Sequence, residues 1–422
     1  MASRLRPTLR RRLGVLIAGV VVVASFTAAT AAAAPATMGG QAAGPTRQGA
    51  DPDRRAGNPP PGFLLERGQF TPVAIPHGLE DLAPQGISPV DINDKGQIVG
   101  SYTDSAVAEH GYLLDRGRFT TIDVPGAKGT QAQGINHRGQ IVGVYSDTSN
   151  PSITGAQLRG FLRDRGRYVR LNVPGAVSSQ AFDINDRGQV VGQFQYTGYC
   201  PDGADPLRGF LRDRSGRFTI IHVPGSAYTT AAGINNRTQV VGEYVDADGT
   251  LHGYLWEKGR FTTIDLPDAT GTSITDINDR DQMIGVYLDA GATGITLQGF
   301  LLSDGAFTEF AAPGVSFTIP FDINNRAQIV GTTLSDLIGA EMHGFLLVDG
   351  VNGRFAPIDF PGAPSTAAFG LNDRGQITGT YVNPAAATDA EPSPMPMPMP
   401  MPMMMMMMMM SSPRPLTRCS KS

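Results

Sequence analysis

Short, mostly apolar runs of residues fill the chain between residues 61 and 383. The runs are rich in Val, Ile, Thr, Phe and Tyr, and Gly, Asn, Asp or Pro separates each one from the next. Such runs are typical of β-strands, and no stretch keeps a helical apolar period without a Gly or Pro. In one unit the predicted strands cover residues 229–235, 239–245, 251–257 and 260–266. The pattern predicts an all-β protein.

This four-strand unit recurs along the chain. Its most constant sequence motif is Ile/Leu-Asn, two or three polar residues, Gln, two mostly aliphatic residues and Gly. This motif occurs seven times. From Asn93 to Asn372 the mean spacing is 46.5 residues. Four strands per unit at a period of about 40–50 residues is the signature of a β-propeller, so we predict seven blades. An open solenoid of the same units is the alternative, and it requires atypical end repeats.

The repeated region begins and ends in the middle of a unit. It starts with the third and fourth strands of a unit, at residues 62–66 and 70–75. It ends with the first and second strands, at residues 367–372 and 376–382. We expect the two halves to pair into one composite blade, because this pairing closes the ring and removes both sheet edges.

The repeated polar residues are interpreted as scaffold. Asn and Asp tolerate a left-handed backbone, so the motif predicts a tight hairpin turn. The glycines inside the strands predict that a neighbouring backbone or ring approaches closely. The glutamines either face a ligand or bond to backbone groups of their own or the neighbouring blade, and we favour the second interpretation because catalysis seldom needs one residue type seven times. The basic turn residues are interpreted as solvated. They are Lys95, Arg138, Arg187, Arg237, Arg280, Arg326 and Arg374.

Both ends of the chain differ in composition from the repeats. In residues 1–33, five arginines precede an apolar run and then small residues, which predicts a secretory signal peptide; an uncleaved anchor is the alternative. Residues 34–60 are predicted to be a disordered linker and residues 384–422 a disordered Pro/Met-rich tail. Cleavage removes five positive charges, so the net charge of −4 becomes −9. That balance argues against nucleic-acid binding.

The repeat resembles a known family. The shared pattern is Gly-Phe-Leu, then Phe-Thr-x-Ile-Asp-x-Pro-Gly-Ala, then Gly-Ile-Asn-x-x-Gly-Gln-Ile-Val-Gly, and it covers residues 61–383. It resembles the HAF-type extracellular repeat of bacterial exported proteins. The resemblance implies a secreted bacterial protein with a propeller-like fold, and it implies no catalytic residue.

Candidate binding residues lie in the connections between second and third strands, on the face opposite the hairpin turns. The longest such loops cover residues 146–158 and 195–207, and the second holds Tyr196 and Tyr199. Loops at one end of a rigid scaffold are the usual place for binding sites. These two tyrosines are therefore candidate ligand contacts.

Asp246 and Asp248 are the other candidates, because Asp-Ala-Asp-Gly resembles part of a calcium loop. The closing Glu of such a loop is missing, so a plain turn is favoured and calcium is the alternative.

The chain contains no nucleophile elbow, zinc-protease motif or phosphate loop, so the sequence assigns no catalytic residue, cofactor or metal ligand. We expect a monomeric, non-enzymatic scaffold that binds an extracellular polysaccharide, protein or surface and, once the signal is cleaved, has no membrane contact. The alternative is a hydrolase or lyase with its site at the mouth of a central channel.

Overall fold

The computed structural model describes residues 62–73, 86–106, 108–146, 158–196, 207–291, 294–335, 341–348 and 354–382. These residues form strands β1 to β29 and contain no helix, so the prediction of an all-β protein is confirmed. The predicted signal peptide, linker and tail lie outside the described residues, as does Tyr199. Within the described ranges, no helix is present that is long and apolar enough to span a membrane.

Three sheets each contain four consecutive antiparallel strands. The first consists of β3 (Ile87–Ile92), β4 (Ile98–Thr103), β5 (Glu109–Asp115) and β6 (Arg118–Ile122). The second consists of β7 (Gly129–Ile135), β8 (Ile141–Ser146), β9 (Leu158–Asp164) and β10 (Arg167–Leu171). The third consists of β11 (Ala176–Ile184), β12 (Val190–Tyr196), β13 (Leu207–Arg212) and β14 (Phe218–Ile221).

The next repeats depart slightly from this plan. One sheet consists of β15 (Tyr228–Thr229), β16 (Gly233–Ile234), β17 (Val240–Val245), β18 (Leu251–Glu257) and β19 (Arg260–Ile264). The following two units join into one eight-stranded sheet through a parallel bridge of Leu297 with Phe317. The first unit is β20 (Gly271–Ile277), β21 (Met283–Gly291), β22 (Gly294–Ser303) and β23 (Ala306–Phe310), and the second is β24 (Phe317–Ile323), β25 (Ile329–Leu334), β26 (Met342–Leu347) and β27 (Phe355–Ile358).

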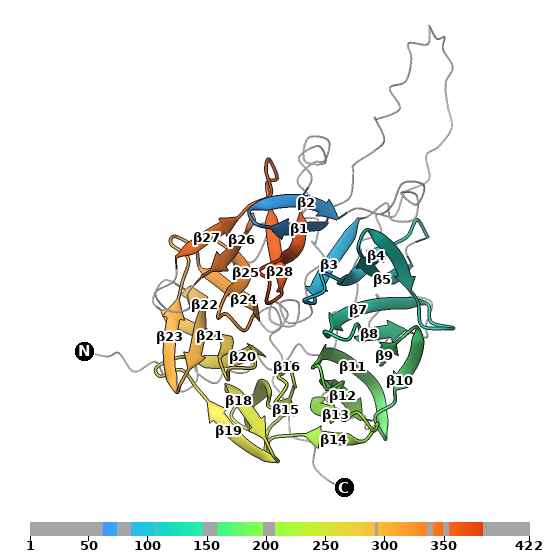
Figure 1. Ribbon diagram of the computed structural model, residues 1–422. Helices are drawn as coiled ribbons and strands as arrows, with labels where there is room; N and C mark the ends of the chain where they lie inside the picture. Colours follow the sequence, from blue (N-terminus) through green and yellow to red (C-terminus); the bar gives the residue numbers. More distant parts are fainter. Residues whose placement is uncertain are drawn as a thin grey trace, which may run out of the picture.

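The two ends of the repeated region share a sheet. This sheet has the order β2-β1-β29-β28, and its strands are β1 (Gly62–Glu66), β2 (Gln69–Val73), β28 (Thr366–Leu371) and β29 (Ile377–Tyr381). The register places Gly62 opposite Thr380 and Leu65 opposite Ile377. Figure 1 shows the sheets arranged side by side around a common centre, with β1 and β2 beside β28.

The hairpin between the first and second strand of each unit has the predicted turn. Gly96 has φ 74°, a left-handed value that glycine adopts without strain. Thr238, Asp281 and Ala327 take the same place in their repeats and also have positive φ, of 67°, 62° and 59°. The turn therefore keeps its geometry where glycine is absent. We call the side with these turns the turn face and the opposite side the loop face.

A β-bulge recurs in the first strand of the units. The pairing shifts between Pro89 and Asp91 in β3, and at the equivalent place in β7, β11, β20, β24 and β28. In the remaining unit the first strand is divided into β15 and β16, although Thr230 and Ala232 still donate their N–H groups to β17. The continuous strand predicted over residues 229–235 is therefore interrupted.

The strand glycines lie where another backbone passes close by, as predicted. A Cβ built on Gly192 would lie 1.9 Å from the carbonyl oxygen of Gln180 on the paired strand. Gly100, Gly143 and Gly379 have the same environment. Side chains of neighbouring sheets interdigitate on both sides: Val99 of β4, for example, shares a buried cluster with Ile141 of β8. No side chain larger than hydrogen fits at these glycine positions.

Candidate functional site

The repeated asparagines form a closed ring of hydrogen bonds on the turn face. Each one donates an Nδ2 hydrogen to the main-chain carbonyl of the asparagine in the next unit, with N···O distances of 2.9 to 3.1 Å. In order the donors are Asn93, Asn136, Asn185, Asn235, Asn278, Asn324 and Asn372. The last bond, from Asn372 to Asn93, joins residues 279 positions apart.

Every hydrogen-bonding position of these asparagine side chains is occupied. In Asn185, the second Nδ2 hydrogen goes to Gln189 Oε1 at 2.9 Å. Its Oδ1 accepts the N–H groups of Arg187 and Gln189, both at 3.0 Å. An amide has two donor hydrogens and an oxygen with two lone pairs, so nothing remains for a ligand. Each repeated glutamine accepts such a bond through Oε1, so it has the structural role that we favoured, but its partner is the asparagine side chain rather than the backbone.

A second series of bonds joins the residues that follow these asparagines. Asp186 N–H, for instance, donates to Asn236 Oδ1 at 2.8 Å. Six such bonds link consecutive units. His137 interrupts the series. It occupies the position at which an Asp or Asn side chain accepts the bond in the other units, and its Nδ1 instead lies 3.3 Å from Asp94 Oδ2. The repeated polar residues of the turn face thus bond mainly to one another.

Four aspartates lie toward the centre of the molecule, two positions before the asparagine of their unit: Asp91, Asp183, Asp276 and Asp322. Each accepts a backbone N–H of the following unit, as Asp183 Oδ2 does from Ile234 at 2.8 Å. The other three units have glycine there, and a Cβ on Gly233 would lie 3.0 Å from Asp276 Oδ1. Asp276 and Asp322 belong to consecutive units, whereas a unit with glycine at this position follows each of the other two aspartates.

Burial perturbs these carboxyl groups. Desolvation raises the pKa of Asp183 to about 8, helped by the negative charges of Asp276 and Asp91. Desolvation also raises the pKa of Asp91 and of Asp276 to about 6. The pKa of Asp322 is raised well above its usual range by desolvation and then by the charge of Asp276. The sequence analysis did not identify this group, because its spacing within the repeat coincides with that of the scaffold residues.

Tyr196 ends strand β12 on the loop face, as the sequence suggested. Its ring meets Phe194 edge-on at 4.9 Å between centroids, and the guanidinium carbon of Arg208 lies 5.1 Å from its centroid. Such a cation–π contact pairs a positive charge with an aromatic surface beside the long loop. Tyr199 lies outside the described residues, so the pair of tyrosines cannot be placed together.

Asp246 organises a local turn. Its Oδ1 accepts the N–H groups of Asp248 at 2.8 Å and Thr250 at 2.9 Å, the geometry of an Asx turn. Its Oδ2 lies 3.2 Å from His252 Nε2, and His252 Nδ1 lies 2.9 Å from Asp265. The described residues contain no group of three or more His, Cys, Asp or Glu side chains placed to hold a metal ion. The calcium alternative stays a prediction.

The same Asp-His-Asp arrangement occurs a second time. His110 lies 2.9 Å from Asp123 and 3.3 Å from Asp104, and its ring stacks on Tyr102 at 5.1 Å. The hydrogen bond to Asp123 is the largest cause that raises the pKa of His110. Both histidines are 6 positions from one aspartate and 13 from the other, a spacing visible in the sequence that we did not use.

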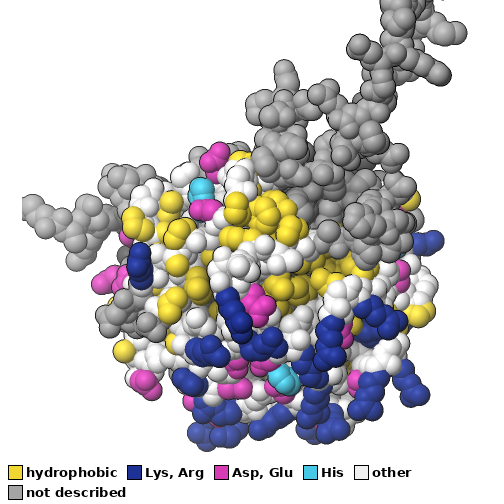
Figure 2. All heavy atoms as spheres, turned by 45° about the horizontal axis from the view of Figure 1, so that its top comes forward, with side chains coloured by type: hydrophobic (Ala, Val, Ile, Leu, Met, Phe, Trp, Pro, Cys, Tyr) yellow, Lys and Arg dark blue, Asp and Glu magenta, His cyan; other side chains and the backbone are white. Residues whose placement is uncertain are grey.

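Positive charge is concentrated in one sector, which the sequence analysis also missed. The described residues from Arg138 to Arg217 contain eleven arginines and four aspartates, a balance of +7. All other described residues contain 12 basic and 23 acidic side chains, a balance of −11. Figure 2 shows Lys and Arg side chains gathered toward the lower part of the face in view, and hydrophobic side chains nearer its middle. Arginine density along the sequence would have revealed this sector.

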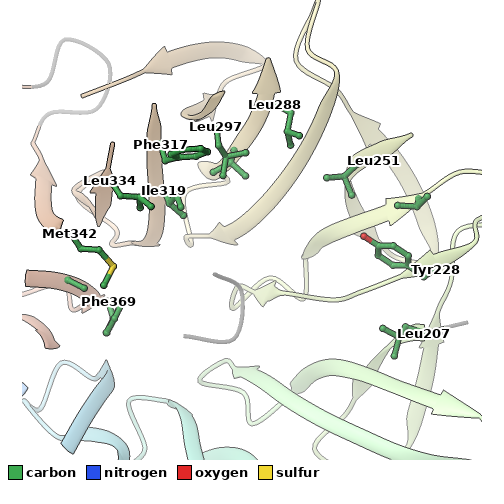
Figure 3. Close-up of a cluster of buried hydrophobic side chains, with 13 residues drawn as sticks. Leu207, Tyr228, Leu251, Leu288, Leu297, Phe317, Ile319, Leu334, Met342 and Phe369 are labelled. Atoms are coloured by element: carbon green, nitrogen blue, oxygen red, sulfur yellow. The ribbon is translucent and has the colours of Figure 1, made fainter. Parts of the chain in front are cut away.

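A buried apolar cluster extends across several units near the loop-face ends of the strands. Leu207 begins β13, Leu251 begins β18 and Met342 begins β26, and all three belong to it. Figure 3 shows these side chains with Tyr228, Leu297 and Phe317, each from a different strand. Because one cluster joins many units, the loop face has a stable apolar base beneath its connections.

Comparisons with known proteins give fold resemblance without an identity. No family model matches the chain, and no curated protein matches it. Among solved structures, it is similar to the Pyrococcus horikoshii acylaminoacyl peptidase, with 13% identity, a TM-score of 0.48, and coverage of 69% of this chain and 46% of that chain. It is also similar to TolB from Acinetobacter baumannii, with 11% identity, a TM-score of 0.40 and coverage of 74% and 73%.

A third similar structure is the Aleuria aurantia lectin, with 12% identity, a TM-score of 0.38, and coverage of 64% of this chain and 94% of that chain. A peptidase and a lectin therefore resemble the chain at comparable levels. Similarity this low says nothing about activity, so function has to be argued from the residues themselves.

Proposed function

We propose that the protein is a closed seven-bladed β-propeller and that its repeats are of the HAF type. Two observations support closure: strands β1 and β29 pair in one sheet, and the ring of asparagine bonds returns from Asn372 to Asn93. An open solenoid would leave the edges of its end strands unpaired. In this proposal β28, β29, β1 and β2 make the composite blade.

We further propose a secreted, monomeric, non-enzymatic scaffold that binds an extracellular polysaccharide or protein through its loop face. One observation carries this proposal: the repeated asparagine side chains of the turn face are fully hydrogen-bonded within the fold, as the four bonds of Asn185 to Gln189, Asn235 and Arg187 show. The asparagines of the ring are therefore unavailable, and contacts with the loop-face ligand fall to residues that the repeats do not share. On the loop face these include Tyr196 with Arg208 and the His252 arrangement with Asp246.

The test combines a glycan array with pull-down from extracellular polysaccharide and protein fractions. The double variant Tyr196→Ala/Arg208→Ala should lose at least tenfold of the binding that the unmodified protein shows. The matched control is Arg280→Ala, an exposed turn-face residue, which should leave that binding unchanged. Absence of any retained glycan or protein, or equal loss in both variants, would contradict binding through the loop face.

The alternative function is a secreted hydrolase or lyase with its site at the centre. The neighbouring carboxyl groups of Asp276 and Asp322 favour it, because two carboxyls with raised pKa values can divide the roles of general acid and base. Against it, both also accept backbone N–H groups of the next unit, at 3.2 and 2.6 Å, so the scaffold already accounts for them. Polysaccharide turnover abolished by Asp322→Asn in a folded variant would favour the enzyme.

A further inference from the structure

An open surface cavity of about 410 Å³, lined by polar residues, lies on the turn face, within the basic sector. Its walls come from two neighbouring units: Arg138 follows the asparagine of one unit, Arg187 and Gln189 belong to the next, and Arg214 lies in the β13–β14 hairpin. Asp213 and Ser215 complete the lining. Cavities of this size accommodate small organic ligands or one to two units of a polymer.

The β13–β14 hairpin differs from that of the preceding unit, and its aspartate is engaged within the hairpin itself. Gly209 and Phe218 are nine positions apart, whereas Gly160 and Tyr168 in the preceding unit are eight apart. In that preceding unit Gln140 Nε2 donates to Asp164 at 3.2 Å. Asp213, the equivalent of Asp164, instead accepts Ser215 Oγ at 2.6 Å and the N–H of Arg217 at 2.9 Å.

Gln189 contributes an oriented amide donor to the cavity. Its Oε1 accepts bonds from Asn185 and from Thr238 Oγ1 at 2.9 and 2.8 Å, which fixes the amide orientation. No described residue accepts a bond from its Nε2, and Gln189 lines the cavity. An oriented N–H of this kind can bond to an oxygen of a ligand without first breaking a bond in the protein.

The three arginines of the cavity also have no partner for their guanidinium groups among the described residues. Two arginines at the same turn position elsewhere do have one: Arg237 donates to the carbonyl of Asp279 at 2.6 Å, and Arg374 to that of Asp94 at 2.9 Å. The single carboxylate of the cavity, Asp213, is already engaged by its own hairpin and lies 3.4 Å from Arg217 Nε. Three positive charges are left to attract a negative ligand.

We propose that this cavity binds an acidic sugar unit, carrying carboxylate or sulfate, of a polysaccharide chain. Guanidinium groups suit planar and tetrahedral oxyanions, and the Gln189 amide, Ser215 hydroxyl and Asp213 carboxylate offer donors and acceptors to sugar hydroxyls. No aromatic ring lines the cavity, which disfavours the base stacking on which single-stranded nucleic acids depend. The site lies on the face opposite the loops and does not depend on a loop-face ligand.

The test uses the full chain and three variants of it. The cavity variant is Arg138→Ala/Arg187→Ala/Arg214→Ala. The matched control is Arg280→Ala/Arg326→Ala/Lys258→Ala, which removes the same charge from two equivalent turns and one equivalent hairpin of other units. The loop-face variant Tyr196→Ala/Arg208→Ala separates this site from the proposed loop-face function. Thermal unfolding of each variant establishes that it is folded.

Binding is measured by titration with dextran sulfate, alginate, neutral dextran, inorganic sulfate and a single-stranded DNA oligonucleotide. Dextran sulfate or alginate should bind, which identifies sulfate or carboxylate as the anionic group, and neutral dextran should not. The cavity variant should bind about tenfold more weakly, and the control and loop-face variants less than threefold.

Four results would overturn the proposal: no binding of either acidic polymer, equal losses in the two triple variants, inorganic sulfate bound as tightly as the polymers, or tighter binding of the DNA.

Discussion

The asparagine of each repeat links two neighbouring units through one side chain. Asn185 bonds to Gln189 within its own unit and to the carbonyl of Asn235 in the next. Both of these bonds use the Nδ2 hydrogens, so aspartate cannot replace asparagine although the two have almost the same shape. Asparagine recurs at this position because its amide supplies two hydrogen-bond donors that a carboxylate lacks.

Asn185→Asp should therefore lower the free energy of unfolding by about 3 kcal/mol, because it loses two donors and places a charge against two oxygen acceptors. The chemically identical change at the exposed Asn172 should alter it by less than about 0.5 kcal/mol. Urea unfolding followed by fluorescence provides the comparison. Equal effects at the two positions would show that the ring bonds contribute little.

The central carboxyl groups make stability depend on pH in an unusual direction. The pKa of Asp183 rises from 3.8 to about 8 on folding. Between these values the folded protein keeps a proton that the unfolded chain has released, so the free energy of unfolding falls as pH rises. The stabilisation by this carboxyl group is complete below about pH 3.8 and is lost as the pH rises through about 8.

The melting temperature should therefore fall by roughly 5 °C between about pH 5 and pH 8. Asp183→Asn removes one titrating group and should make this slope shallower, whatever its effect on absolute stability. Asp268→Asn, at an exposed position, serves as the control and should leave the slope unchanged. A melting temperature that rises over this range would contradict the prediction.

The second strand of each unit is the element with the least tolerance, because its glycine lies against the carbonyl of the paired strand. At Gly192 an added Cβ would lie 1.9 Å from Gln180 O, a separation that only a backbone shift relieves. Hairpin glycines are different: around Gly166 nothing lies within 4 Å of such a Cβ, although its φ is 80°. The strand glycine is thus required because no space exists for a side chain, and the hairpin glycine because its backbone is left-handed.

Gly192→Ala should lower the free energy of unfolding by more than about 3 kcal/mol, because overpacking displaces the strand. Gly166→Ala should lower it by only about 1 kcal/mol, the usual effect of a left-handed backbone on alanine. Chemical unfolding of the two variants measures the difference. If both lose the same amount, close backbone approach is not the reason for the strand glycine.

Elements set by local chemistry were predictable from the sequence. The hairpin turns, the strand at residues 251–257 and the Asp246 turn depend on nearby residues, and they were recognised. The next strand was recognised too, but it ends at Ile264 rather than at residue 266. The aspartate–glycine pairing between units depends on partners more than 40 positions away, and it was not recognised. The bulge and the divided strand β15–β16 arise between paired strands of one unit, and they were also not predicted. The Gln189 amide was not recognised as a group that lines a cavity, because the engagement of Asp213 by its own hairpin is visible only in the structure.

At the scale of the whole molecule, the pairing of β1 with β29 decides whether sheet edges are exposed. Phe63 lies opposite Gly379, and the Thr378 hydroxyl donates to the Phe63 carbonyl at 2.9 Å. Without β1 and β2, strand β29 would present unpaired N–H and C=O groups along its length. Such an edge pairs readily with another chain.

A chain that begins at Gly86, and so lacks β1 and β2, should therefore associate and lose cooperative unfolding. Size-exclusion chromatography with light scattering should show dimers or larger species for this truncated chain, whereas the full chain should elute as a monomer. Removal of residues 384–422, which include none of these strands, serves as the control and should preserve the monomer. A monomeric, cooperative truncated chain would contradict the role given to this pairing.

The same pairing has a consequence for how the molecule is made. Phe63 and Thr378 are 315 positions apart, so at 5–20 residues per second β1 is synthesised roughly 15–60 s before its partner exists. During this delay the internal units can fold from local contacts, while the first two strands have no sheet to join. A chain that ends prematurely never supplies β29. The pairing thereby distinguishes finished molecules from unfinished ones, since only the latter keep an open edge for proteases.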